Sequence, residues 1–256
     1  MPHQHRIRFA LKTASAHLGV NILVAAAVAA LIFWVWYPFP YHQLMGSLDL
    51  MWLIIAVDVV CGPVLTLVLA DPRKRRAVLL RDLSWVVLIQ LAALVYGIHT
   101  VAVVRPVVVV FEQDRFNVVS ALEVQQEELA SAPAGLQSLS WSGPKRIALR
   151  EAQDLKERDT TLDLSLQGIE PSMRPSRWLP DNEATHTAIR AKMQPLGKLL
   201  ARYPNDADLQ VAVAASGLPE NRLYYLPLTS WKNKDWTVLL DEDTQFRGFV
   251  PLDAFF

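Results

Sequence analysis

The sequence contains few residues that could carry out catalysis. It has no glycine-rich phosphate-binding pattern, no G-x-S-x-G serine nucleophile, no H-E-x-x-H zinc pattern and no C-x-x-C pair. His186 is the only histidine after residue 104, and Cys61 is the only cysteine of the chain, so the second half offers neither a zinc site nor a disulfide. A Ser-His-Asp triad around His186 can be drawn on paper, but a surface histidine on a helix is the simpler interpretation. We therefore expect no catalytic residue, no metal and no cofactor.

The most informative polar residue lies in an apolar stretch. Asp58 occurs in DVVCGPVLTL, and an ionised carboxylate in hydrocarbon costs at least about 2.5–3.5 kcal/mol. Gly62 follows on the same helix face, and Pro63 has no N–H to bond to the preceding turn. This pattern predicts a polar notch that faces another helix, either of this chain or of a client protein. The alternative is an internal hydrogen bond that pins the helices, with three polar side chains as possible partners: Gln90, Tyr96 and Asn21.

Composition indicates a membrane protein. The chain has 256 residues, 52% of them hydrophobic, and its mean hydropathy is +0.21. The overall charge is zero, but the two parts of the chain differ in net charge. Residues 1–104 carry eight basic and four acidic side chains, whereas residues 105–256 carry 17 basic and 21 acidic ones. No block of the second half is basic enough to follow a phosphate backbone, so nucleic acid is not an expected partner.

Three apolar runs are long enough to cross the roughly 30 Å hydrocarbon core as helices: residues 18–37, 48–70 and 83–104. The first run could also be a cleaved signal peptide, since the residues before it are basic. However, it is longer than the roughly 7–15 residues of such an apolar region and ends in WVWYPFPY rather than in small residues. Pro38 and Pro40 end the first helix, and Asp71-Pro72 ends the second.

The short connections predict the topology. The segment between the second and third runs, DPRKRRAVLLRD, is rich in Arg and Lys, whereas PFPYHQLMGSLD between the first two contains neither. Basic loops stay in the cytoplasm, so residues 1–17 and the second connection belong on the cytoplasmic side of an inner membrane. Residues 18–104 form the membrane region, and residues 105–256 lie in the periplasm.

The second half resembles an ordinary α+β domain. PVVVVF and RFNVV read as two strands around a turn, and KRIALR as a third. Ser120 and Glu123 match a capping box that predicts a helix to about Leu129. The pattern over residues 181–202 predicts a helix interrupted near Pro195, and the closing residues predict a β-meander containing WTVLL and FRGFVPL. The predicted fold class is therefore a three-helix transmembrane bundle followed by a C-terminal α+β extracytoplasmic domain.

Several segments together resemble a known family. YPFPY, DVVCGPVLTLVLADPRK and RDLSWVVLIQLAALVYGIHTVAVVRPVVVVFEQDRFNVV are similar to the type IV pilin accessory proteins of the TfpX/TfpZ type, also called fimbrial assembly proteins. The similarity covers about residues 15–125 and, more loosely, the closing YYLPL…WTVLLDEDT stretch. The signature positions that it implies are Asp58, Gly62, Pro63, Leu65, Thr66, Leu67, Asp82, Gln90, Tyr96, Gly97, Arg105, Pro106, Arg115 and Phe116.

The resemblance implies a non-enzymatic inner-membrane factor that helps a pilin to accumulate and assemble. Its expected partners are a type IV pilin, other pilus assembly proteins of the inner membrane, and membrane lipids. The hypothesis for partner binding rests on the signature positions other than Leu65 and Leu67. The alternative is a membrane-anchored sensor or immunity-type protein whose periplasmic domain captures another protein or ligand.

Overall fold

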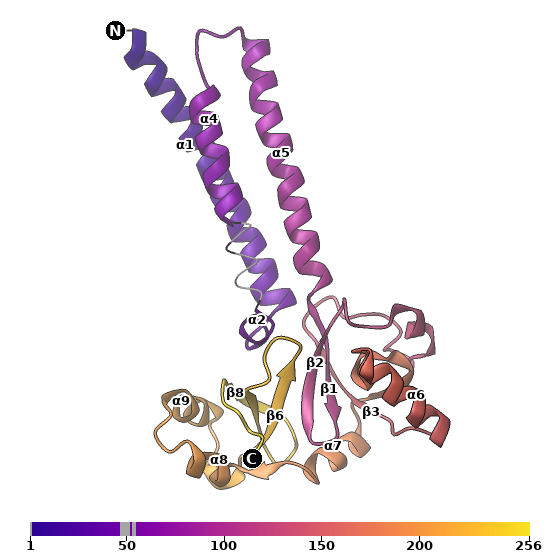
Figure 1. Cartoon of the computed structure of the whole chain (residues 1–256). Coiled ribbons are helices and arrows are strands. Elements are labelled where there is room, and N and C mark those ends of the chain that lie inside the picture. The colour runs from indigo at the N-terminus through magenta and orange to yellow at the C-terminus, as the bar shows by residue number, and fades with distance from the viewer. Residues whose placement is uncertain (1, 47–51, 53–54) are drawn as a thin grey trace. The chain divides into compact units, whose positions relative to one another are not determined.

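A computed structural model describes residues 2–46, 52 and 55–256 of the chain. The chain divides into two compact units (Figure 1). The helical unit comprises Met1–His42 and Gly46–Val103, and the sheet unit comprises Gln43–Met45 and Val104–Phe256.

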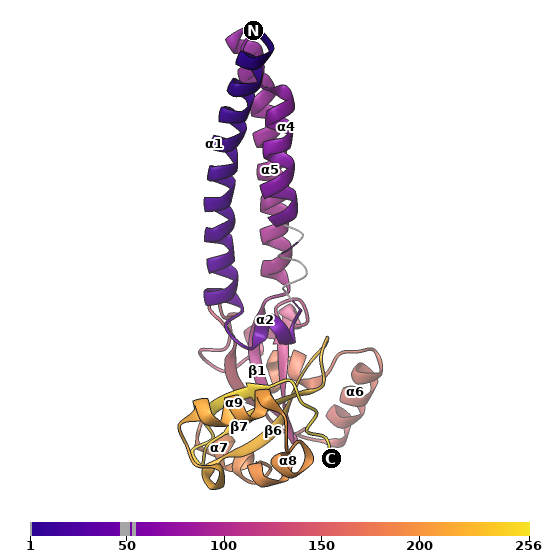
Figure 2. The same ribbon diagram turned by 90° about the vertical axis from the view of Figure 1, so that its left-hand side faces the viewer.

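The helical unit contains two long apolar helices (Figures 1 and 2). Helix α1 spans Pro2–Ala30 and continues as the π-helical turn η1, Leu31–Trp36, while α5 spans Arg76–Val103. Neither has a proline in its interior, and both are rich in alanine and leucine, which favour uninterrupted helix. The segments Arg6–Trp36 and Arg76–Val103 are long and apolar enough to cross a membrane.

The apolar side chains of these two helices are exposed. Within the most apolar part of each helix only 6% and 17% of the residues are buried. Leu23 on α1 is 72% exposed, and Trp85 on α5 is 60% exposed. Water-soluble proteins rarely leave so large an apolar surface uncovered, so the two helices indicate association with a membrane.

The predicted span over residues 48–70 is described in part. Its described residues form the π-helical turn η2, Ala56–Cys61, and helix α4, Gly62–Leu69. The apolar helix Val59–Leu69 is shorter than the roughly 20 residues of a span, and residues 48–51, 53 and 54 lie outside the described residues. The part of the chain that the structure describes thus has two helices of spanning length, not the predicted three.

Prolines end the helices where the sequence predicts. The first helix ends at Trp36, just before Pro38, and the short helix α2, Tyr41–Leu44, follows Pro40. Helix α4 ends at Leu69, before Asp71-Pro72, because a proline disfavours helical geometry at the residue that precedes it.

The sheet unit is a mixed sheet of eight strands in the order β4-β3-β1-β2-β6-β7-β8, with β5 paired to β6. The strands are β1 Pro106–Glu112, β2 Arg115–Ser120, β3 Lys145–Leu149, β4 Trp178–Pro180, β5 Gln194–Pro195, β6 Tyr224–Ser230, β7 Trp236–Leu240 and β8 Phe246–Val250. The helices are α6 Leu155–Leu166, α7 Glu183–Arg190, α8 Leu196–Arg202 and α9 Ala207–Ser216, with 3-10 turns η3 Gln126–Ser131, η4 Pro171–Met173, η5 Pro175–Arg177 and η6 Glu220–Arg222. Strand β1 is antiparallel to β2 and parallel to β3, and β2 is parallel to β6.

Two apolar clusters hold this unit together. One surrounds β1, β2 and β3 and includes Val108, Ile147 and Trp178. The other joins β6, β7 and β8 to α8 and α9 through Leu199 and Leu209, both fully buried. The predicted hairpin, the third strand and the closing meander are confirmed, and the helix predicted over 181–202 is interrupted by β5 at Pro195.

The helix predicted from Ser120 to Leu129 is wrong. The side chains of the capping box do pair, since the backbone N–H and the hydroxyl of Ser120 both donate to the Glu123 carboxylate, at 2.8 and 2.7 Å. However, the backbone N–H of Gln125 bonds to the carbonyl of Met173, 2.9 Å away and far along the chain. Contacts of this kind with distant segments override a local helix signal, and only the 3-10 turn η3 follows.

Candidate partner-binding site

A groove of about 330 Å³ lies between α1 and α5 in the helical unit. Its walls are His17, Val20, Asn21, Val24, Ala25, Val28, Ala29, Ile55, Val87, Gln90, Leu91 and Leu94. Asn21, Ala25 and Ala29 follow one another at intervals of four residues and therefore lie on one stripe of α1. Small side chains in such a stripe let another helix approach closely within a membrane.

Gly62 is placed against Gln90, the polar residue of the groove wall on α5. A methyl group at Gly62 would overlap the amide at the end of the flexible Gln90 side chain, so Gln90 packs directly on the glycine and would have to move if a methyl group were added. The structure therefore brings these two predicted site residues together, and Gly62 is buried. Close packing through glycine is a common device of membrane helices.

Thr66 connects α4 to α1. Its side chain is buried, and its hydroxyl lies 2.6 Å from Nδ1 of His17. A polar contact between apolar helices fixes their register because neither group finds another partner in hydrocarbon. His17 was not among the predicted site residues. The signal that could have found it is a histidine next to the first apolar run, with a threonine as a possible partner inside another run.

Of the predicted notch, the structure describes the part formed by Gly62 and Pro63. Pro63 is the second residue of α4, and because η2 continues into α4 through helical backbone at Cys61 and Gly62, the proline cannot donate a hydrogen bond to the preceding turn. The π-helical turn η2 directly precedes it, and changes of this kind commonly accompany proline in a helix. The backbone of Asp58 lies in η2, but its side chain lies outside the described part of the chain, so the notch itself stays a prediction.

The other predicted residues of the helical unit lie apart from the groove. Asp82, on α5, pairs with Nζ of Lys74 at 2.8 Å, and this ion pair ties the connection between α4 and α5 to the first turns of α5. Tyr96 is 73% exposed and lies on a different face of α5, beside His99. Gly97 follows it on α5 and is half-buried.

Four predicted site residues belong to the sheet unit instead. Arg105 and Pro106 lead into β1, where the carbonyl of Arg105 accepts from the backbone N–H of Ala121 and Pro106 pairs with Ser120. Arg115 stacks on the ring of Phe255 at 4.7 Å. Phe116 is fully buried, and its ring lies 5.0 Å from that of Phe246. These contacts give the residues packing roles within the sheet unit.

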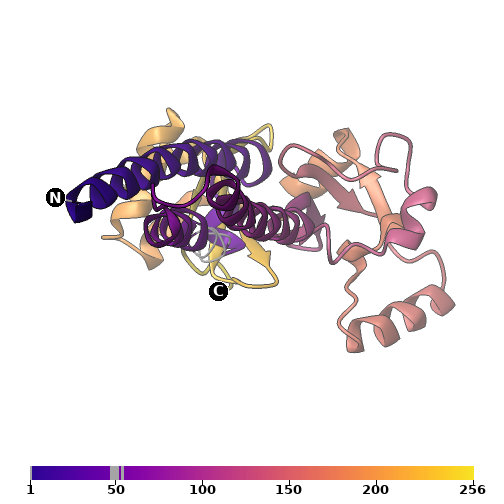
Figure 3. The same ribbon diagram turned by 90° about the horizontal axis from the view of Figure 1, so that it is seen from above.

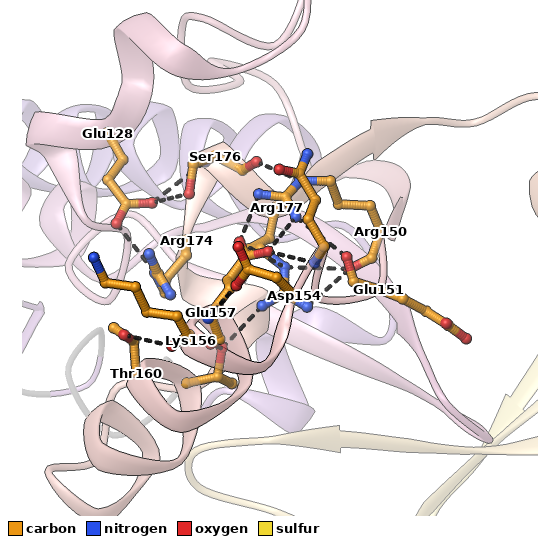
Figure 4. A network of polar contacts seen from close by, with 12 residues as sticks. Glu128, Arg150, Glu151, Asp154, Lys156, Glu157, Thr160, Arg174, Ser176 and Arg177 are labelled. Carbon is orange, nitrogen blue, oxygen red and sulfur yellow. Dashed lines mark hydrogen bonds and ion pairs between the residues drawn. The ribbon is translucent and has the colours of Figure 1, made fainter.

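A polar network joins η3, η5 and α6 of the sheet unit (Figure 4). The guanidinium of Arg150 donates to both carboxylate oxygens of Glu157, at 2.8 and 2.7 Å, and this pairing lowers the pKa of Glu157 to about 2. The buried Arg177 donates to the carbonyl of Arg150 at 2.9 Å, and Arg174 pairs with Glu128. Glu157 thus serves both Arg150 and Arg177, and the network cross-links the segments that carry these side chains.

His186 forms a second polar cluster, on α7. Its Nε2 lies 3.0 Å from Asp181 and 3.1 Å from the guanidinium of Arg146, which also donates to the carbonyl of Thr244 at 2.5 Å. The cluster links strand β3 to the turn before β8. Among the described residues, no group of three or more His, Cys, Asp or Glu side chains is arranged to hold a metal ion.

The fold and the groove define a membrane-associated protein in which an apolar helical unit precedes a mixed-sheet domain. The chain belongs to the family of fimbrial assembly proteins. It is 34% identical to the fimbrial assembly protein of serogroup I of Dichelobacter nodosus over 255 residues, and 34% identical to that of serogroup E1 over 256 residues, in both cases 99% of each chain. A third relative, of serogroups C1 and C2, is 42% identical over 130 residues, which are 51% of this chain and 99% of the relative.

The family model described as fimbrial assembly protein FimB matches residues 5–46. These residues include most of α1 and therefore one wall of the groove. No solved structure matches the chain. Membership of the family supports a role in pilus biogenesis.

Proposed function

We propose that this protein is a non-enzymatic inner-membrane accessory factor that binds and stabilises a cognate type IV pilin and promotes its assembly. The observation that carries the proposal is the groove between α1 and α5. Before assembly, a pilin is held in the membrane by one apolar amino-terminal helix, with its globular head outside. A factor that protects it needs a site for an apolar helix within the bilayer.

The groove has a suitable length and chemistry for one face of such a helix. From His17 to Ala29 it follows α1 over 13 residues, a rise of about 18 Å at 1.5 Å per residue, which is just over three turns. Ala25 and Ala29 provide close approach, and Gln90 provides one polar group that can bond across helices. Most of the remaining wall is aliphatic, as an apolar guest requires.

The proposed topology has three spans, at about residues 18–37, 48–70 and 83–104, with the N-terminus cytoplasmic and residues 105–256 periplasmic. The asymmetry of basic residues between the two short connections supports it. A reporter that is active only in the periplasm should be active when fused after Phe256 and silent after Arg76. The reverse pattern would overturn this arrangement.

Pilin capture can be tested by filling the groove. The double substitution Ala25→Leu/Ala29→Leu adds bulk to its wall and should abolish co-purification of pilin with the full-length protein from detergent-solubilised membranes. The matched control is Ala26→Leu/Ala27→Leu, which adds the same atoms to exposed positions of α1 outside the groove. Equal pilin recovery with both variants, at equal abundance of the protein, would refute binding in the groove.

We extend the proposal to Asp58, which with Gly62 and Pro63 would shape a polar face toward the pilin helix. Asp58→Asn removes the charge and keeps the polarity, whereas Asp58→Leu removes both and lowers the cost of insertion. We expect Asp58→Leu to lower pilin abundance without lowering its own. Normal pilin abundance in this variant would exclude Asp58 from client contact, and loss of the variant itself from membranes would assign Asp58 to holding the helices together.

A further inference from the structure

Two tryptophans of the sheet unit are exposed. Trp141 lies in the loop before β3 and is 63% exposed, and Trp231 directly follows β6 and is 60% exposed. An indole ring has one of the largest apolar surfaces of any side chain and a single polar N–H. Such rings are enriched at the boundary between membrane and water.

Strand register places both loops at one edge of the sheet. Pro106, the first residue of β1, pairs with Ser120 at the end of β2, and Val118 of β2 pairs with Ser230 at the end of β6. Strand β3 runs parallel to β1 and begins at Lys145, four residues after Trp141. Both tryptophans therefore leave the sheet at the edge where β1 begins, as the directions of β1 and β6 in Figure 1 also show.

The loop of Trp141 is tied to the residue that follows the last apolar helix. Arg105 donates to the carbonyl of Ser140 at 3.3 Å, and its guanidinium lies 5.7 Å from the centre of the Trp141 ring. Arg105 is two residues beyond Val103, where α5 ends, and two residues span at most about 7 Å of extended chain. If α5 crosses the membrane, Trp141 is held close to the bilayer surface.

The loop of Trp231 is tied to the connection that follows the first apolar helix. The carbonyl of Leu44 accepts from the hydroxyl of Ser230 at 3.0 Å and from the side-chain amide of Asn233 at 2.8 Å. Leu44 is eight residues beyond Trp36, where the first apolar helix ends. Lys232 and Lys234 of the same loop are exposed, against one acidic residue, Asp235, so the loop is basic.

We infer that this edge of the sheet unit is a membrane-binding surface, in which Trp141 and Trp231 insert at the headgroup level of the bilayer and Lys232 and Lys234 contact anionic headgroups. The inference rests on the proposed membrane topology but not on pilin binding. It gives the sheet domain a fixed height above the bilayer. A client held by its membrane helix would then meet the domain at a defined distance from the lipid.

The test uses the full-length protein in nanodiscs that contain phosphatidylcholine, phosphatidylglycerol and a lipid with a nickel-chelating headgroup. Cys61 is replaced by alanine, and a nitroxide is attached at Ser142→Cys, next to Trp141, or at Asp114→Cys, in the turn at the opposite end of β1. Strand β1 has seven residues, so the two labels lie at positions about 20 Å apart along the strand. A third label at Leu88→Cys, exposed on α5, reports whether that helix is in the lipid through its accessibility to oxygen.

We expect nickel to relax the label at residue 142 several-fold more than the label at residue 114. Trp141→Ala/Trp231→Ala should reduce this difference, and omission of phosphatidylglycerol should weaken it. Equal relaxation at 142 and 114, with the label at 88 in the lipid, would overturn the inference and indicate that the tryptophans face another protein. A label at 88 outside the lipid would overturn both the inference and the proposed topology.

Discussion

The packing of Gly62 against Gln90 makes a quantitative prediction for the helical unit. Gly62→Ala introduces a methyl group that overlaps the amide of Gln90, while α4 gains a residue with better helix propensity. The overlap costs about 0.5–1.5 kcal/mol, because the methyl group meets the flexible end of the Gln90 side chain, which must leave its preferred rotamer. The gain in propensity is at most about 1 kcal/mol at this first position of α4. We therefore expect Gly62→Ala alone to destabilise the protein slightly or to leave its stability unchanged.

The two contributions separate in a double-mutant cycle. Gln90→Ala alone should cost about 0.6 kcal/mol, the average for polar contacts between membrane helices, and at most about 1.7 kcal/mol. In Gly62→Ala/Gln90→Ala the overlap is absent and the gain in propensity remains, so the double variant should be more stable than the sum of the single effects by about 0.5–1.5 kcal/mol. Unfolding of the four full-length proteins in mixed micelles, followed by far-UV circular dichroism, measures the cycle. Additive effects would refute the reasoning, because they would show that Gly62 does not constrain the Gln90 side chain.

Three further predictions concern single side chains. The pKa of Glu157 is lowered to about 2 by Arg150. The pair therefore stabilises the sheet unit at pH values above the ordinary glutamate pKa of about 4.3, and this contribution is lost as the pH falls from there toward 2. Thermal unfolding of Glu157→Gln should depend less on pH in this range than that of the unmodified protein. Replacing His186 with alanine should leave pilus assembly intact. Loss of pili at normal abundance of the variant protein would show that the function of the protein requires His186. Tyr37→Phe removes a buried 2.9 Å hydrogen bond to a carbonyl of α5 and should cost about 0.5–1.5 kcal/mol, whereas Tyr96→Phe, at an exposed position, should cost nothing measurable in the same unfolding assay.

Elements with strong local patterns could be predicted from the sequence. The β-branched run of β1, the aromatic strands of the closing meander and the prolines after Trp36 each act through the chain immediately around them. Helix α9, Ala207–Ser216, was missed because its apolar residues are not arranged on one face, although Asp206 caps its first turn by accepting from the N–H of Leu209. Strand β4 has three residues and exists through pairing with β3.

The candidate site was predicted in part for the same reason. Gly62 and Gln90 stand out because a glycine-proline step and an amide are unusual in apolar runs, and the structure brings them together. The groove was not predicted, because it depends on the distance between α1 and α5, two helices that are far apart in sequence. Ala25 and Ala29 in its α1 wall are four residues apart, a spacing that is visible in the sequence. Alanine at that spacing is common in helices, however, and indicates a helix-packing site only when the facing helix is known.

The groove exists because α4 packs on both long helices (Figure 3). It meets α1 through the contact between Thr66 and His17, and α5 through Gly62 and Gln90. Both contacts depend on polar or glycine residues, which in a membrane set helix position more specifically than aliphatic packing does. With α4 fixed to each, α1 and α5 form the two long walls of the groove, with Ala25 and Ala29 on the α1 side, and neither alanine takes part in the two contacts of α4. Substitution of Thr66 by valine should therefore weaken pilin capture by altering the spacing of the helices, although Thr66 itself is not part of the groove wall.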